Sequence, residues 1–135
     1  MRFGGHETFP IREGWLHKGL RLLNDDPELL SAEDLADHLG VGRNMGKAIR
    51  HWLQATQLAE KNPNAESGKR TLLQLTDLGQ LVWKQDPYFL SEGTWWFLHV
   101  NLVNNPEFAA SWAWFFNSFG HDRFGRDVCV ESLSR

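Results

Sequence analysis

The sequence predicts a mainly α-helical protein: a winged helix-turn-helix with a small β-hairpin wing, followed by a Trp-rich α-helical extension. Three observations predict this fold. They are a pair of amphipathic segments joined by a short glycine turn, two short apolar segments around a turn-rich loop, and aromatic residues crowded into the second half. We place the winged helix-turn-helix at residues 1–85 and the extension, packed on it, at residues 86–135.

Two amphipathic helices open the predicted fold. Residues 13–23 have the spacing of a helix with one buried stripe, formed by Leu16, Leu20 and Leu23. The turn-forming sequence Asn-Asp-Asp-Pro at 24–27 ends this helix. Ser31 is placed to cap a second helix of about nine residues, because Asp34 follows it at the position of a capping box.

The third predicted helix, from Arg43 to about Thr56, has the clearest amphipathic pattern in the sequence. It follows the turn Gly40-Val41-Gly42, which suits the steep angle between the helices of a helix-turn-helix. Its apolar face consists of Met45, Ala48, Ile49, Trp52, Leu53 and Thr56. Its opposite face carries the side-chain types that contact phosphates and base edges: Arg43, Asn44, Lys47, Arg50, His51 and Gln54.

A β-hairpin follows the third helix. Residues 58–61 form its first strand, residues 62–68 are a turn-rich loop, and residues 71–75 form the returning strand. Lys69 and Arg70 lie at the base of this loop, where a wing contacts the sugar-phosphate backbone. Thr76 then caps a further helix, over residues 77–83.

The extension is predicted to contain two aromatic helices, over residues 93–104 and 106–119, the second starting at Pro106. The first is apolar on nearly all sides, which is typical of a helix buried in a domain or at an interface. We therefore expect four large side chains of these two helices to be buried together: Trp96, Val100, Trp112 and Phe116. A last helix over residues 128–133 is incomplete where the sequence ends, so we expect a further C-terminal region.

The distribution of charge favours nucleic-acid binding, although the formal net charge of -3 does not. Residues 24–37 contain six acidic residues and no Lys or Arg, whereas residues 42–71 contain six basic residues and two acidic ones. A basic helix surface is by itself more often only solvated. The preceding helix, the glycine turn and the basic hairpin stand in the order of a winged helix, which favours DNA. The predicted DNA-binding residues are Arg43, Asn44, Lys47, Arg50, His51, Gln54, Lys69 and Arg70.

Other chemistry has weaker support. The motif His6-Glu7-Thr8 lacks a second ligand pair at a recognisable spacing, so we expect it to cap or brace the first helix rather than to bind metal. His121, Asp122 and Cys129 carry no stronger signal. The single cysteine excludes an internal disulfide and a multi-cysteine zinc site. We predict no metal, no cofactor and no catalytic residue in this segment.

The sequence gives no sign of export or membrane insertion. The N-terminus lacks the apolar core of a signal peptide, and no run of 18 apolar residues occurs. We therefore expect a cytoplasmic protein without a membrane partner.

Seven stretches that together cover the whole chain resemble a bacterial family, catalogued as a domain of unknown function, whose members are encoded beside DNA phosphorothioation genes. The matching stretches are residues 5–10 with Gly14, Trp15, Leu16 and Lys18; residues 40–45, 49–50, 76–79 and 86–88; Trp95, Trp96, Leu98 and His99; and Trp112, Trp114, Phe116 and Asn117. The resemblance implies work with an apparatus that exchanges a non-bridging phosphate oxygen for sulfur, in anti-phage defence. It implies as partners a cysteine desulfurase and an ATP-pyrophosphatase-type sulfurtransferase.

These observations lead to one hypothesis and two alternatives. The hypothesis is a sequence- or modification-associated DNA-binding component of a bacterial phosphorothioation and anti-phage defence system, with double-stranded DNA as its partner. The first alternative is a DNA-nicking enzyme of the same system, whose active site lies here or in the expected C-terminal region. The second is a winged helix used only for protein association. A homodimer is left open.

Overall fold

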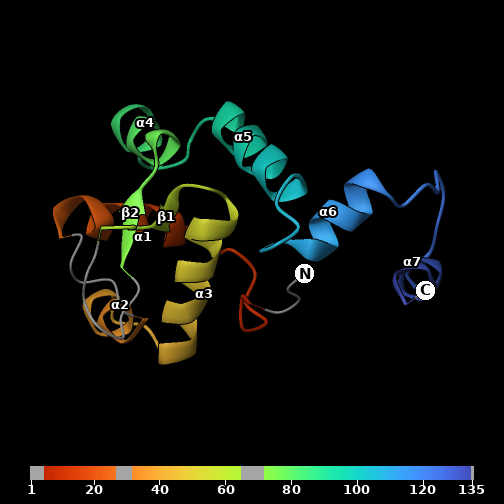
Figure 1. Cartoon of the computed structure of the whole chain (residues 1–135), viewed down its shortest axis with the longest axis horizontal. Coiled ribbons are helices and arrows are strands. Elements are labelled where there is room, and N and C mark those ends of the chain that lie inside the picture. The colour runs from red at the N-terminus through yellow and green to blue at the C-terminus, as the bar shows by residue number, and fades with distance from the viewer. Residues whose placement is uncertain (1–4, 27–31, 65–71, 135) are drawn as a thin grey trace.

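The computed structural model describes residues 5–26, 32–64 and 72–134. Within these residues the fold is mainly helical with one small antiparallel sheet of two strands, as predicted. The elements in chain order are α1 (Trp15–Asp25), α2 (Ala32–Leu39), α3 (Arg43–Ala55), β1 (Ala59–Lys61), β2 (Leu73–Leu75), α4 (Asp77–Gln85), α5 (Glu92–Val103), α6 (Ala110–Asn117) and α7 (Arg126–Leu133) (Figure 1). The proposed cap at Ser31 lies outside the described residues.

The main core lies between α1, α2 and α3. The predicted stripe of α1 is buried, as is the predicted apolar face of α3 except for the partly exposed Met45. Gly19 lets α1 approach α3 closely, because a Cβ atom at this position would lie 2.7 Å from the Leu53 Cδ1 atom. The amphipathic pattern of these helices thus predicted correctly which sides face the core.

The two strands pair in antiparallel register, with Glu60 opposite Gln74. The side-chain amide of Gln74 donates a 2.9 Å hydrogen bond to the Glu60 carboxylate across this pair. After β2, the Thr76 hydroxyl accepts a hydrogen bond from the Gly79 backbone N–H, which confirms the predicted cap of α4. A Cβ atom at Gly79 would overlap the backbone carbonyl oxygen of Leu58, so only glycine lets α4 start so close to the hairpin.

Helix α5 joins the same core through Leu98 and Leu102. Asn101 of α5 and Asn105, just after this helix, also satisfy backbone groups at the end of α3. The Asn101 amide donates to the carbonyl of Thr56 at 2.9 Å, and the Asn105 amide donates to the carbonyl of Ala55 at 3.2 Å. The chain then turns at residues 106–108, and α6 begins only at Ala110, so the prediction that Pro106 starts the helix was wrong.

The aromatic side chains of α5 and α6 are not buried together, contrary to expectation. The exposed fractions are 66% for Trp96, 51% for Val100, 38% for Trp112 and 53% for Phe116. The small side chains of Ala109, Ala110 and Ala113 face inward instead. Because α5 is apolar on nearly all sides, its periodicity does not select the side that packs against the core.

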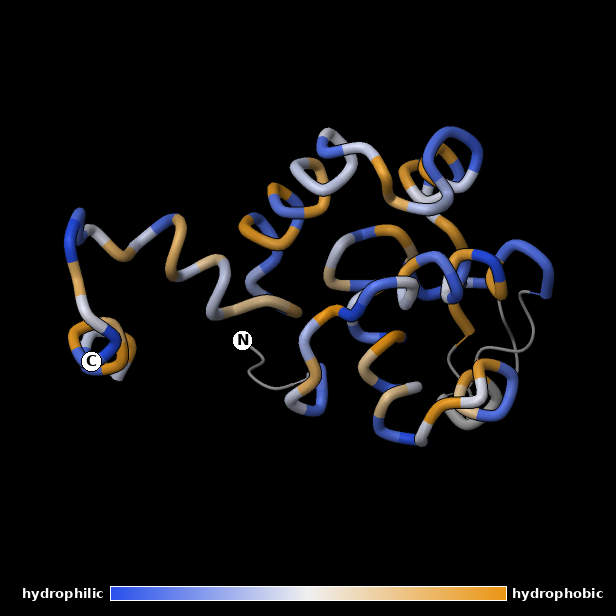
Figure 2. The backbone as a smooth tube through the Cα atoms, turned by 180° about the vertical axis from the view of Figure 1, so that it is seen from behind, coloured by the Kyte–Doolittle hydropathy of each residue, from blue (hydrophilic) through white to orange (hydrophobic). Residues whose placement is uncertain are grey.

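Helix α7 stands apart from the rest of the molecule, with α6 between it and α5 (Figure 1). None of its residues is buried, although several of them are hydrophobic (Figure 2). No helix among residues 5–26, 32–64 and 72–134 combines the length and hydropathy needed to cross a membrane.

Candidate nucleic-acid interface

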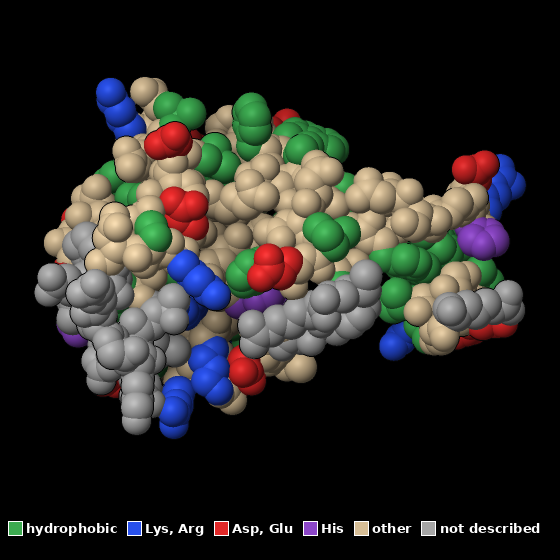
Figure 3. All heavy atoms as spheres, in the orientation of Figure 1, with side chains coloured by type: hydrophobic (Ala, Val, Ile, Leu, Met, Phe, Trp, Pro, Cys, Tyr) green, Lys and Arg blue, Asp and Glu red, His purple; other side chains and the backbone are tan. Residues whose placement is uncertain are grey.

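The N-terminal end of α3 combines a helix start with exposed basic and amide side chains. Gly42 precedes the helix in an extended conformation and, as a glycine, supplies no side-chain cap to the first backbone N–H groups. These groups and the helix dipole give the end a partial positive charge. Arg43 and Asn44 are exposed in this first turn, and Lys47 follows one turn later. Lys and Arg side chains gather at the surface over this part of α3 (Figure 3).

The N-terminal turn at residues 6–9 packs against the middle of α3. The Glu7 carboxylate lies 3.5 Å from the Lys47 ammonium, and the His6 ring stacks on Trp52 with centroids 5.4 Å apart. The Trp52 indole N–H donates a 2.9 Å hydrogen bond to the carbonyl of Phe9. His6 and Glu7 therefore brace α3, and the prediction that they brace the first helix was wrong.

The backbone of this turn is unusual. Glu7 and Thr8 have φ angles of 51° and 69°, in the left-handed region that residues with a side chain rarely adopt. The Phe9 N–H closes the turn by a 2.9 Å hydrogen bond to the carbonyl of His6. The buried Nδ1 atom of His6 has no hydrogen-bond partner in the described part of the chain. Contacts to Trp52 and Lys47 hold this conformation in place, which gives the turn a defined position beside α3.

The predicted DNA-binding face divides into two parts. His51 is only 5% exposed and lies between the rings of His6 and Phe108, so its prediction as an accessible contact was wrong. Arg50 is partly buried, and this desolvation lowers the pKa of its guanidinium from the usual value. The Gln54 amide donates to the carbonyl of Arg50 at 3.3 Å. Accessible polar groups are therefore concentrated in the first turns of α3.

The other predicted contacts, Lys69 and Arg70 of the wing, lie outside the described residues. Of the predicted set, the structure brings together Arg43, Asn44 and Lys47. The N-terminal turn, whose Glu7 carboxylate contacts Lys47, was missed as part of this surface. Its six-residue motif at 5–10 was visible in the sequence, but no local pattern linked it to a helix some 40 residues later.

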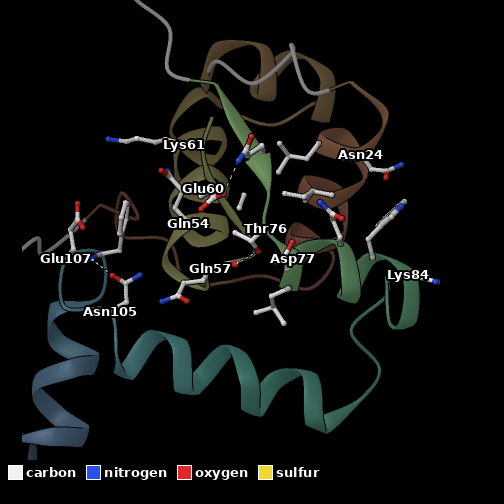
Figure 4. A pocket seen from close by; sticks show the side chains of 18 residues that line it. Asn24, Gln54, Gln57, Glu60, Lys61, Thr76, Asp77, Lys84, Asn105 and Glu107 are labelled. Atoms are coloured by element: carbon white, nitrogen blue, oxygen red, sulfur yellow. Dashed lines mark hydrogen bonds between the residues drawn. The ribbon is translucent and has the colours of Figure 1, made fainter. Parts of the chain in front are cut away.

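A hollow with a volume of about 1280 Å³ lies beside the hairpin (Figure 4). It is bordered by the end of α3, both strands, α4 and the turn before α6. Its lining includes six neutral amide side chains, from Asn24, Gln54, Gln57, Gln74, Gln80 and Asn105. Acidic and basic groups are mixed around them, so this hollow lacks the single sign of charge that a phosphate backbone requires.

Clustered metal ligands are not found in the described ranges. Within residues 5–26, 32–64 and 72–134, no three His, Cys, Asp or Glu residues are grouped so that they could hold a metal ion. His121 and Asp122 are exposed, and the His121 ring packs on Phe119 with centroids 5.0 Å apart. Cys129 is a partly buried free thiol.

Comparison with solved structures finds two close matches to this arrangement. One, "Magnesium ion-bound SspB crystal structure", is 30% identical, with a TM-score of 0.83 over 97% of this chain. The other, "SspB crystal structure", is 31% identical, with a TM-score of 0.82 over 97% of this chain. This chain spans only 40% and 41% of the lengths of those two chains. No curated protein matches the sequence.

A family model settles the relationship of the whole chain. The model described as "Protein of unknown function (DUF4007)" matches residues 3–135. The match extends through the turn at 5–10, α3 and the aromatic helices, which are the stretches on which the resemblance was based. The chain belongs to the DUF4007 family of proteins of unknown function.

Proposed function

We propose that this chain is a DNA-binding component of a bacterial DNA phosphorothioation and anti-phage defence system. The arrangement of α2, α3 and the hairpin supports a winged helix-turn-helix, with α3 as the recognition helix. The observation that carries the proposal is that Arg43, Asn44 and Lys47 are accessible together at the N-terminal end of α3. A recognition helix enters the major groove by this end.

The link to phosphorothioation has a separate basis. It comes from the family resemblance, and the similarity to the two SspB structures supports it. The cysteine desulfurase and the sulfurtransferase of such a system are the proposed protein partners. Because this chain spans about two fifths of those structures, the DNA-binding role is proposed for the matched part alone.

The decisive experiment is a titration of a labelled DNA duplex, followed by fluorescence anisotropy at several salt concentrations. With about five phosphate contacts, log affinity falls with log salt at a slope of about -4 to -5. Arg43→Glu combined with Lys47→Gln removes two of these contacts, so the slope falls by about 2 and affinity drops at every salt concentration. Lys84→Glu, on α4 at the other end of the domain, is the matched control and leaves binding nearly unchanged.

Glu7 provides a second test of the same surface. Its carboxylate competes with DNA phosphate for the Lys47 ammonium, which lies 3.5 Å away. Glu7→Gln therefore raises affinity for the duplex by about two- to threefold, the equivalent of an exposed ion pair. Equal affinities for the wild type and Glu7→Gln would show that Lys47 does not contact DNA.

Two other candidate functions would give different experimental results. The magnesium ion bound by one of the similar SspB structures keeps DNA nicking as a second candidate. Incubation with supercoiled plasmid and Mg²⁺ or Mn²⁺ would then yield relaxed product. A winged helix used only for protein association would show no salt-dependent binding to any duplex. Comparing plain and phosphorothioated duplexes in the same titration tests whether modified DNA is preferred.

A further inference from the structure

Helices α5 and α6 form an apolar groove that this chain leaves open. The groove has a volume of about 480 Å³ and is lined by Glu92, Trp95, Trp96, His99 and Phe116. Trp96 and Phe116 are both more than half exposed, and the His99 ring packs against Phe116 with centroids 4.6 Å apart. Contiguous apolar surface around a groove is typical of an interaction site.

The segment that carries the groove lacks basic residues, which disfavours nucleic acid and anionic lipid as its partners. The chain has no Lys or Arg between Lys84 and Arg123, and its charged residues in this interval are Asp86, Glu92, Glu107 and Asp122. Nucleic acid and anionic lipid both require nearby cations. The aromatic rings of the groove are therefore suited to an apolar protein surface with a basic residue beside it.

Helix α7 of the same chain has these properties. Arg126, Val130 and Leu133 are spaced at i, i+4 and i+7, so they form one stripe with a cation at its start. Val130 and Leu133 are exposed, and no residue of α7 is buried. Within the described residues, neither Arg126 nor Glu92 of the groove has an ion-pair partner. The molecule thus exposes both a groove and a helix that matches it in polarity and charge.

The connection between α6 and α7 keeps this helix away from the groove of its own chain. Phe119 stacks on Phe115 with centroids 5.4 Å apart and meets Phe124 edge-on at 4.7 Å. These contacts hold α7 at the far end of the molecule, with α6 between it and α5 (Figure 1). A second copy can present its α7 to the groove without disturbing this cluster.

We propose that two copies of this chain associate by reciprocal exchange of α7, each inserting the stripe Arg126–Val130–Leu133 into the α5/α6 groove of the other. In the proposed dimer the exchange is reciprocal and therefore two-fold symmetric, so each copy's groove holds the partner's helix. Val130 and Leu133 cover the rings of Trp96 and Phe116, and Arg126 pairs with Glu92. This association does not depend on the proposed DNA binding, because no residue of α3 takes part in it.

Sedimentation velocity with the 135-residue chain tests this proposal. We expect the wild type to sediment with twice the monomer mass of 15.6 kDa. Trp96→Glu in the groove and Val130→Asp on the stripe each place a charge in the apolar contact, so each gives a monomer. Leu81→Asp is the matched control, because Leu81 is 56% exposed on α4 and lies outside the groove, and this variant remains a dimer.

Mixing the two monomeric variants provides the sharper result. A Trp96→Glu copy retains its stripe and a Val130→Asp copy retains its groove, so one intact contact forms and a weaker 1:1 heterodimer appears. Circular dichroism confirms that each variant is folded. A wild type that stays monomeric at every concentration, or a dimer that survives both substitutions, would overturn the proposal. A monomeric wild type would assign the groove instead to the part of the longer similar chains that this chain does not match.

Discussion

Helices α3 and α5 are nearly equal in length, 13 and 12 residues, but they differ in the exposure of their tryptophans. Trp52 of α3 is 4% exposed, whereas Trp96 of α5 is 66% exposed. Helix α3 has a polar side that must face water, so its apolar side can only face the core. Helix α5 has no such division, and only Leu98 and Leu102 are buried. Apolar composition therefore indicates that a helix needs apolar neighbours. Only an amphipathic pattern predicts which side of the helix faces the core.

The largest expected effect compares these two tryptophans directly. Trp52→Ala removes a buried ring that stacks on His6 and donates a hydrogen bond to the carbonyl of Phe9. We expect it to lower the free energy of unfolding by about 3 to 5 kcal/mol. Trp96→Ala should change it by less than about 0.5 kcal/mol in the monomer, because most of this ring is already in water.

Urea denaturation of both variants, followed by circular dichroism, measures this difference. The comparison is made at a protein concentration where the chain is monomeric, since association would stabilise the wild type. Similar losses for Trp52→Ala and Trp96→Ala would contradict the described burial of α5. The remaining tryptophans make fluorescence a poor single probe, so the far-ultraviolet signal of the helices is preferable.

The junction between the two regions gives the next largest effect. The Asn101 and Asn105 amides donate to carbonyls at the end of α3, and each such hydrogen bond contributes about 0.5 to 1.5 kcal/mol. We expect Asn101→Ala combined with Asn105→Ala to lower the free energy of unfolding by about 1 to 3 kcal/mol. Asn104→Ala is the matched control, because its amide donates only to Val100 within the same helix.

Much of the fold could be predicted because its signals are local. The cap at Thr76 depends on residues three positions apart, and the core side of α3 on a spacing of three and four. The start of α6 was misplaced because Pro106 is as compatible with a turn as with the first turn of a helix. The exposure of the aromatic rings of α5 and α6 could not be predicted, because apolar residues on nearly all sides of a helix do not indicate which side faces the core.

The candidate site was predicted only in part, because it combines distant segments. Arg43 and Asn44 were correctly placed on the exposed beginning of α3 from helical spacing alone. The burial of His51 results from His6 and Phe108, which lie about 45 and 57 positions away in the sequence. The contact between Glu7 and Lys47 also joins residues far apart in the sequence, because a strained turn brings the carboxylate to α3. Long-range contacts of this kind leave no periodic signal.

The smallest expected effect concerns Asp86, which connects α4 of the first region to α5 of the second. Its carboxylate accepts hydrogen bonds from the Thr94 hydroxyl at 2.7 Å and from the backbone N–H groups of Leu90 and Ser91 at 2.8 and 3.1 Å. The hydrogen bond from Thr94 makes the largest contribution to lowering the pKa of Asp86 below its usual value; desolvation opposes it, and the two backbone bonds add to it.

The lowered pKa fixes the direction of the pH dependence. A carboxylate with a lower pKa in the folded chain than in the unfolded chain stabilises the fold above the unfolded pKa, which is about 3.9 for Asp. This contribution is lost as the pH falls through the lower, folded-state pKa. We expect Asp86→Asn to lower the melting temperature at pH 7, and the difference from the wild type to shrink only below about pH 4. Thr94→Val, which removes the principal donor, should shift this loss toward higher pH. A difference between wild type and Asp86→Asn that stays constant from neutral to strongly acidic pH would show that the charged carboxylate does not hold α5 in place.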